Sequence, residues 1–119
     1  DDAVNFIPSR LSGLLIVLAA YVAHMDGAGA MRIFRRDRAK HASPNSAQTE
    51  AACAGALGVI LAGDAYYFGK LYKKEYIGDD RREIEPEDIV RANRLMYAAS
   101  VMALVILLGL KTALYFILF

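Results

Sequence analysis

The residues best suited to chemistry fall within a short polar window near the middle of the chain. This window combines cations, carboxylates, an imidazole, a hydroxyl and an amide: Arg36, Asp37, Lys40, His41, Ser43, Asn45 and Glu50. Arginine and lysine beside a helix start can cradle phosphate. One or two carboxylates can hold Mg²⁺ together with phosphate oxygens, and histidine can shuttle a proton near neutral pH. A basic helix followed by a capped turn explains the same residues without any ligand.

A proline turn divides the window. Pro44 biases Ser43 away from helical angles. Asn45 is a good helix N-cap, and Gln48 follows it at a capping-box spacing. We therefore predict a helix from Asn45 to about Leu61, whose first N–H groups and dipole favour an anion.

Small residues dominate this expected helix, in the run "AACAGALGVILAG". Ala51, Gly55 and Gly58 would let another backbone come close. Glycine costs a helix interior roughly 0.5–1 kcal/mol relative to alanine, so close helix packing or a bulky ligand should compensate. Cys53 is interpreted as a small buried hydrophobic residue rather than a nucleophile.

Two apolar segments flank the polar middle. The segment from Leu11 to Met25 approaches the ~17–25 residues that a membrane-crossing helix needs. The segment from Leu95 to Phe119 reaches that length with a single charge, Lys111, which can snorkel towards an interface. We expect both to be membrane helices, with a soluble helical core as the alternative.

The elements between these segments are predicted from local signals. A basic helix carries Arg32, Arg35, Arg36, Arg38 and Lys40 against a single Asp37, which marks the cytoplasmic side of a membrane and suits anionic headgroups. The stretch 65–78 suits a short hairpin or an extended loop, and 79–86 a solvated linker. Pro86 and the acids after it favour a helix start. The fold class is therefore mostly α: a membrane protein with two apolar helices near its termini, a basic juxtamembrane helix, a small-residue central helix and a short hairpin, in a single domain over 1–119.

Composition excludes several function classes. A net charge of +1 gives no general affinity for nucleic acid. A single cysteine permits neither a disulfide framework within the chain nor a cysteine-rich zinc site. The sequence also lacks a P-loop, a dinucleotide fingerprint, an HExxH motif and a nucleophile elbow.

Four sequence blocks resemble the adenosylcobinamide-phosphate synthase family, in order and at similar spacing. They are "DDAVNFIPSRL", "RRDRAKHASPNSAQTEAACAGALGV", "DAYYFGK" and "IEPEDIVRANRLMY". The chain departs from the family pattern at Ala42, Asp64 and Ala65, and it lacks a tryptophan and a proline after Asn45. The resemblance places the chain in the C-terminal portion of such an enzyme, whose N-terminal part contributes further membrane helices. The isolated portion is then expected to be inactive.

The resemblance implies an integral inner-membrane protein of cobalamin biosynthesis, multi-pass, with its polar segment in the cytoplasm. The implied reaction joins adenosylcobyric acid to an aminoalcohol phosphate, typically aminopropanol phosphate, through an amide bond. ATP and Mg²⁺ are the expected energy source, and the corrinoid is a substrate. The alternative hypothesis is a non-catalytic membrane remnant or scaffold subunit that binds lipid or a partner through its basic loop.

The family motifs also imply roles for individual residues. Phosphate groups would be neutralised by Arg10, Arg36 and Lys40. Mg²⁺ would be positioned by Asp37 or Glu50, and His41 would help deprotonate the attacking amine. Asn45 would bind phosphate or a corrin amide, while Asn5 and Ser43 match motif positions that are expected to contact substrate. The corrinoid would face Gly55, Gly58 and Tyr67.

Overall fold

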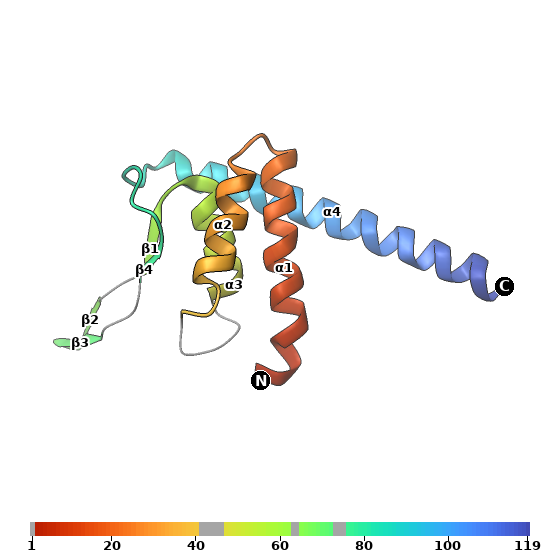
Figure 1. Cartoon of the computed structure of the whole chain (residues 1–119), viewed down its shortest axis with the longest axis horizontal. Coiled ribbons are helices and arrows are strands. Elements are labelled where there is room, and N and C mark those ends of the chain that lie inside the picture. The colour runs from red at the N-terminus through yellow and green to blue at the C-terminus, as the bar shows by residue number, and fades with distance from the viewer. Residues whose placement is uncertain (1, 41–46, 63–64, 73–75) are drawn as a thin grey trace.

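The computed structural model describes residues 2–40, 47–62, 65–72 and 76–119, and it is mostly helical. Helix α1 (Asp2–Val22) and helix α2 (Gly27–Asp37) run antiparallel, with helix α3 (Ala47–Leu57) beside them (Figure 1). Helix α4 (Glu87–Leu118) passes α1 crosswise, and its C-terminal half projects beyond the other helices. The predicted mostly α fold with two long apolar helices at its ends is confirmed.

The predicted hairpin within 65–78 is present, and a second antiparallel ladder uses residues 60–62, most of which the predicted helix included. Strand β1 (Ile60–Ala62) pairs with β4 (Tyr76–Gly78), and β2 (Ala65–Tyr67) pairs with β3 (Lys70–Tyr72). The β2–β3 connection is the two-residue loop Phe68–Gly69, and both residues have positive φ, at 53° and 76°. Such a loop matches the twist of its flanking strands.

Helix boundaries differ from the prediction where local geometry intervenes. Helix α3 ends at Leu57 rather than at about Leu61, because Gly58 adopts φ 71° and a left-handed residue terminates a helix. The predicted start at Asn45 lies outside the described residues. Helix α2 begins after Asp26, whose Oδ1 accepts a 2.9 Å hydrogen bond from the N–H of Gly29 and so caps the helix.

The core lies where the four helices meet. One apolar cluster joins α1, α2, α3 and α4 through mainly small residues: Ile16, Val17, Ala19, Ala20, Ala30, Phe34, Ala52, Ala56, Leu95 and Ala99. A second cluster packs α2 and α3 against β4 through Ile33, Ala47, Ala51, Ala54 and Ile77. These clusters hold the end of α2 and the start of α3, which are the two flanks of the polar window.

Candidate functional site

The end of α2 holds a buried carboxylate surrounded by cations. Asp37 is fully buried. Its Oδ1 accepts a 2.8 Å hydrogen bond from Nε of Arg36 and lies 3.1 Å from Nζ of Lys40. Its Oδ2 accepts hydrogen bonds from Nη2 of Arg36 at 2.8 Å and from the N–H of Gly78 at 2.7 Å. We call Arg36, Asp37, Lys40 and Gly78 the α2–β4 junction.

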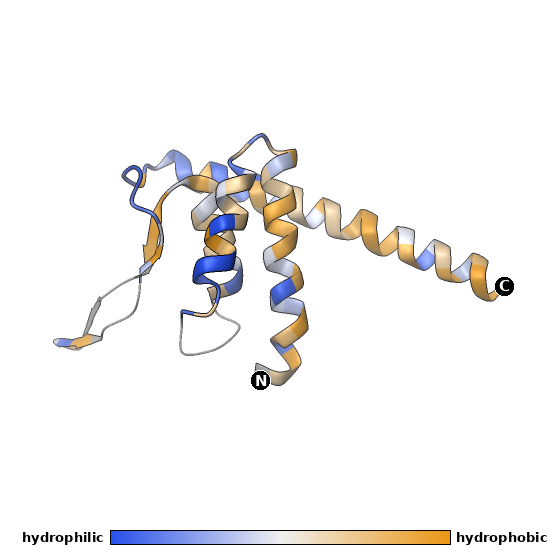
Figure 2. Cartoon of the chain, in the orientation of Figure 1, coloured by the Kyte–Doolittle hydropathy of each residue, from blue (hydrophilic) through white to orange (hydrophobic). Residues whose placement is uncertain are grey.

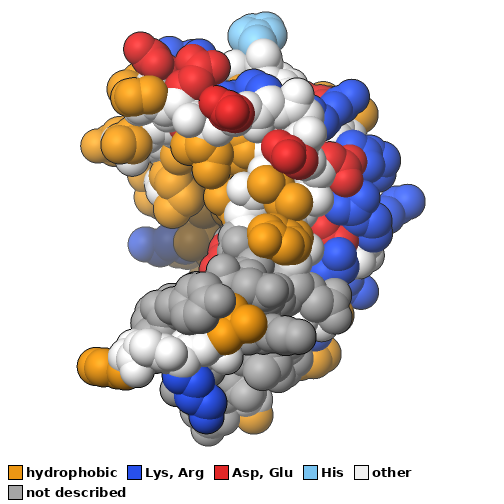
Figure 3. Space-filling model, turned by 90° about the vertical axis from the view of Figure 1, so that its left-hand side faces the viewer, with side chains coloured by type: hydrophobic (Ala, Val, Ile, Leu, Met, Phe, Trp, Pro, Cys, Tyr) orange, Lys and Arg blue, Asp and Glu red, His pale blue; other side chains and the backbone are white. Residues whose placement is uncertain are grey.

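The junction extends to a second carboxylate on the surface. Asp79 lies 2.8 Å from Nη1 of Arg36 and 2.8 Å from Nη1 of Arg32, one through each carboxylate oxygen. Lys40 also donates to the carbonyl of Tyr76 at 3.2 Å. Figure 3 shows arginine and lysine side chains gathered along one edge of the molecule, with acidic side chains among them. Local charge is therefore largely balanced within the fold.

The ionisation of the junction follows from these contacts. Burial alone raises the pKa of Asp37, but hydrogen bonds from Arg36, Gly78 and Lys40 outweigh that effect and hold the pKa well below its usual range. Hydrogen bonds to Asp37 and Asp79 raise the pKa of Arg36. Asp37 is accordingly ionised at neutral pH, and it fastens α2 to β4.

The contacts of Asp37 bear on its expected role in positioning Mg²⁺. Both oxygens of Asp37 already accept from cations or from an N–H group, so the geometry does not support the expected metal-positioning role of this residue. Among the residues that the structure describes, no group of three or more His, Cys, Asp or Glu side chains could hold a metal ion.

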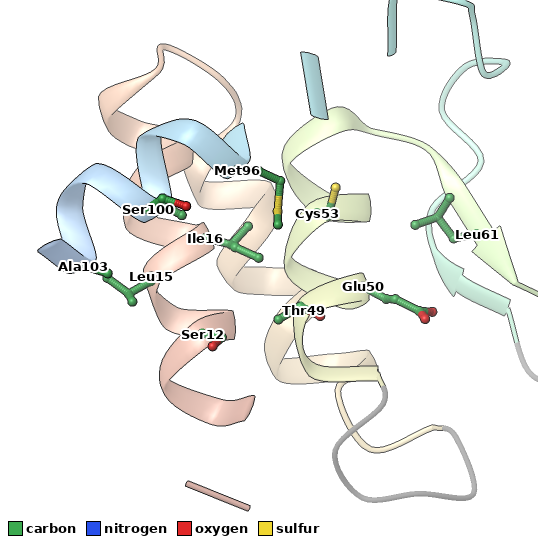
Figure 4. A pocket seen from close by; sticks show the side chains of 11 residues that line it. Ser12, Leu15, Ile16, Thr49, Glu50, Cys53, Leu61, Met96, Ser100 and Ala103 are labelled. Atoms are coloured by element: carbon green, nitrogen blue, oxygen red, sulfur yellow. The ribbon is translucent and has the colours of Figure 1, made fainter. Parts of the chain in front are cut away.

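Glu50, the other carboxylate predicted from the sequence, lies one turn into α3 at an apolar cavity of about 440 Å³. Figure 4 shows Ile16, Cys53 and Met96 projecting into the space between α1, α3 and α4, with Glu50 on the side of α3 that faces Leu61. The cavity is lined by Ser12, Leu15, Ile16, Thr49, Glu50, Cys53, Leu61, Met96, Ala99, Ser100 and Ala103. Sequence reasoning missed this cavity, because its walls come from segments far apart in the chain.

Cys53 lies between two cavities. It lines the 440 Å³ cavity and also a second of about 520 Å³ beside Leu57, Ile84 and Ile89. Burial, followed by the charges of Asp88 and Glu50, raises the pKa of the Cys53 thiol. This thiol is therefore poorly nucleophilic, in agreement with its interpretation as a small packing residue.

The two glycines expected to face a corrinoid have structural explanations. A Cβ on Gly55 would meet the backbone of Gly29 and Ala30, so Gly55 allows α2 and α3 to touch. Gly58 supplies the left-handed residue that ends α3. The geometry thus favours the helix contact that the sequence left open as an alternative to a ligand surface. Tyr67 lies on β2 in register with Lys70.

The remaining predicted residues divide between α1 and the segment 41–46. Asn5 is exposed on α1. The guanidinium of Arg10 lies 3.5 Å from the ring centroid of Phe6, and Nη1 donates to the Phe6 carbonyl. His41, Ser43 and Asn45 lie outside the described residues. The structure therefore brings together Arg36, Asp37 and Lys40 from the predicted set.

A second ionic cluster, which the sequence did not predict, ties the start of α4 to the end of α3. Arg82 donates to both oxygens of Asp88, at 2.9 and 2.6 Å, and its Nε donates to the carbonyl of Leu57. Arg91 and the N–H of Glu85 also donate to Asp88. The stretch 79–86 is thus fastened at Arg82 rather than being only a solvated linker.

Fold and site define a mostly helical protein with two helices long and apolar enough to cross a membrane. A family model described as CobD/Cbib protein matches residues 1–96. The chain is 50% identical over 111 residues to cobalamin biosynthesis protein CobD of Klebsiella pneumoniae, covering 93% of this chain and 35% of that protein. It is 46% identical over 114 residues to cobalamin biosynthesis protein CbiB of Salmonella typhimurium, covering 96% of this chain and 36% of that protein.

The CobD protein of Clostridium perfringens is 42% identical over 111 residues, again with 93% and 35% coverage. The chain therefore belongs to the CobD/CbiB family, and the predicted family is confirmed. This membership supports a role in cobalamin biosynthesis. The chain spans about a third of the length of these curated relatives. No solved structure matches it.

Proposed function

We propose that this chain forms part of a membrane-bound synthase that joins adenosylcobyric acid to an aminoalcohol phosphate through an amide bond. The observation that carries the proposal is the family match over residues 1–96, which includes the whole polar window. In the proposed reaction the carboxylate takes a phosphoryl group from ATP. The amine nitrogen then bonds to the carboxyl carbon, the carboxyl C–O bond breaks, the oxygen leaves with the phosphate, and the amine gives up a proton. Mg²⁺ would neutralise the phosphate oxygens of ATP.

The chain contributes an anchored frame for the segment 41–46. On one flank, Lys40 is held by Asp37 and the carbonyl of Tyr76. On the other flank, Ala47 is fully buried. Packed flanks of this kind commonly carry binding and catalytic side chains on the loops between them. The frame supports a site in this segment.

Roles follow from side-chain chemistry and from this frame. His41 would accept a proton from the attacking amine, because only the neutral amine has a lone pair to donate. Ser43 and Asn45 would hydrogen-bond substrate, with Lys40 and Arg10 near phosphate. Arg36 is better assigned a positioning role, since its guanidinium grips Asp37 at 2.8 Å through two nitrogens.

The complete protein would be a multi-pass component of the inner membrane, with the polar window in the cytoplasm. Support for a membrane location comes from the long apolar helix α4 and from the cations of α2. Retention of Lys and Arg on the cytoplasmic side is a general rule for segments beside membrane helices.

The test uses membranes that contain the full-length protein. Adenosylcobyric acid, aminopropanol phosphate, ATP and Mg²⁺ are supplied, and adenosylcobinamide phosphate is followed by liquid chromatography and mass spectrometry. The double variant His41→Ala/Asn45→Ala should lower product formation by at least about 10²-fold. Arg38→Ala, which removes an exposed cation of the same region, is the matched control.

Two results would count against the proposal. Unchanged turnover in the double variant would remove the site assignment. Failure of the unaltered full-length protein to bind corrinoid or make product would favour the scaffold hypothesis, in which the basic loop binds lipid or a partner.

A further inference from the structure

The outer face of α1 carries a continuous apolar stripe. The residues Val4, Ile7, Leu11, Leu14, Leu18 and Tyr21 are 40% to 71% exposed. They recur at steps of three and four residues, so they share one side of the helix. The opposite side, which includes Gly13, Ile16 and Val17, packs into the core. The apolar stripe therefore has no cover among the described residues.

The C-terminal half of α4 projects in the direction that this stripe faces. Figure 1 shows α2, α3 and the strands on one side of α1, while α4 crosses α1 and extends from the other side. The crossing is made where Met96, Ser100 and Ala103 lie near Ser12 and Leu15 around the 440 Å³ cavity. Beyond it, every residue of α4 from Leu104 onwards is exposed, and Figure 2 shows this half to be almost wholly hydrophobic.

Helix α1 cannot cross a bilayer in this arrangement without taking charge with it. Phe34 of α2 lies against Gly13, near the middle of α1. Arg32, Arg35 and Arg36 are exposed on the same short helix. Placing an arginine at the centre of a bilayer is strongly unfavourable. Figure 2 shows a hydrophilic stretch of α2 alongside α1, so a crossing α1 would hold the cations of α2 at hydrocarbon depth.

We propose that α4 is the helix of this chain that crosses the membrane, and that α1 lies in the headgroup region of the same bilayer with its apolar stripe against lipid. Lipid is the partner that covers the stripe, because the stripe faces the same side as the C-terminal half of α4. Among the described residues, that half is the only apolar half-helix that is wholly exposed. Arg10, on the flank of the stripe, suits the phosphate level. The charged side of α2 then faces water.

The dimensions agree with this placement. Leu104 to Leu118 is about 15 residues, or roughly 22 Å at 1.5 Å per residue. An interfacial helix sits about 5–10 Å below the headgroup surface. This depth and the roughly 22 Å of α4 together match a hydrocarbon core of about 30 Å. Lys111 lies at the midpoint of this stretch, so its long stem must extend along the helix towards a headgroup level.

The test uses the absence of tryptophan from the chain. Single substitutions Val4→Trp, Leu11→Trp and Leu18→Trp mark the two ends and the middle of the stripe. Leu107→Trp marks α4, and Tyr76→Trp on β4 is the water-exposed control. Each full chain is reconstituted in phosphatidylethanolamine–phosphatidylglycerol vesicles. Lipids brominated at different acyl positions then report the depth of each indole by fluorescence quenching.

The expected result is equal, shallow quenching of all three α1 variants, deep quenching of Leu107→Trp and no quenching of Tyr76→Trp. A crossing α1 would instead place Leu11→Trp about 10 Å deeper than both of its neighbours, at 1.5 Å per residue. That outcome overturns the proposal. Two other outcomes also overturn it: no quenching of the three α1 variants, as in the Tyr76→Trp control, or no quenching of Leu107→Trp. Far-ultraviolet circular dichroism of each variant confirms that the helices are retained.

This inference rests on the proposed membrane location and not on the proposed reaction. The two fail separately, because quenching depth needs neither corrinoid nor ATP, whereas loss of product formation would leave the depth profile unchanged.

Discussion

The backbone N–H of Gly78 donates a 2.7 Å hydrogen bond to Oδ2 of Asp37, across a sequence separation of 41 residues. This bond joins the last residue of α2 to the last residue of β4. Gly78 has φ 94°, and a Cβ there would meet the carbonyl of Val59. The contact therefore requires a carboxylate on one side and a glycine on the other, and substitutions around it should have measurable consequences.

Arg36→Ala should destabilise the protein far more than Arg35→Ala. Removal of Arg36 takes four hydrogen bonds from the network and leaves the buried Asp37 carboxylate to Lys40 and Gly78. Loss of a partner to a buried charge costs about 3–5 kcal/mol, and the half-exposed guanidinium reduces the expected cost to roughly 2–3 kcal/mol. Arg35 is exposed on the same helix, and its removal should change stability by less than about 0.5 kcal/mol. Denaturant unfolding in detergent measures both, and equal costs would show that the junction does not stabilise the fold.

Acid should weaken the α2–β4 junction. The pKa of Asp37 in the folded chain lies below its unfolded value of about 3.9. The carboxylate therefore contributes stability that is present above about pH 4–5 and is lost as the pH falls below about 4. Unfolding midpoints measured from pH 6 to pH 2.5 should fall less steeply in Asp37→Asn than in the unaltered chain.

Asp79→Asn is the matched control for this titration. Hydrogen bonds from Arg36 and Arg32 lower the pKa of Asp79 as well, but this carboxylate lies on the surface and its ion pairs are screened by water. The acid dependence should therefore remain nearly intact in Asp79→Asn. If Asp37→Asn and Asp79→Asn reduce the pH dependence of the unfolding midpoint equally, the burial of Asp37 does not control that dependence.

Gly55→Ala should destabilise the α2–α3 contact, whereas Gly109→Ala should not. The added methyl group at Gly55 would overlap the backbone of Gly29 and Ala30, and overpacking of this kind typically costs about 1–3 kcal/mol. At Gly109 the methyl group meets no described atom within 4 Å, and alanine favours a helix by roughly 0.5–1 kcal/mol. Thermal unfolding monitored by circular dichroism separates the two. A neutral Gly55→Ala would mean that the helices do not touch there.

The Cys53 thiol should react slowly with iodoacetamide at neutral pH. Burial raises its pKa, so the thiolate fraction is lower than in an unfolded chain, whose cysteine has a pKa of about 8.5. The rate should continue to rise with pH beyond the point at which the denatured chain reaches its plateau. A folded chain that plateaus at or below that pH would show an activated thiol instead.

Local signals in the sequence predicted the helices better than their partners. The cations of α2, the hairpin pattern of 65–78 and the proline before α4 act over a few residues, and each element appears where they indicate. The α2–β4 junction and the Arg82–Asp88 cluster depend on residues brought together by the fold. The sequence pattern does not reveal that Arg36 forms its hydrogen bonds with the neighbouring Asp37 rather than with a ligand. An arginine has the same place in the sequence whether a carboxylate of the fold or a ligand accepts its hydrogen bonds.

The contact between Gly29 and Gly55 joins main chain to main chain. Where two helices meet through long side chains, rotamer changes can absorb a displacement. Here there is little side chain to absorb it, so α2 and α3 should move as one rigid block. A force applied at Arg36, near the C-terminal end of α2, would then be transmitted directly to α3 and to the cavity lined by Glu50.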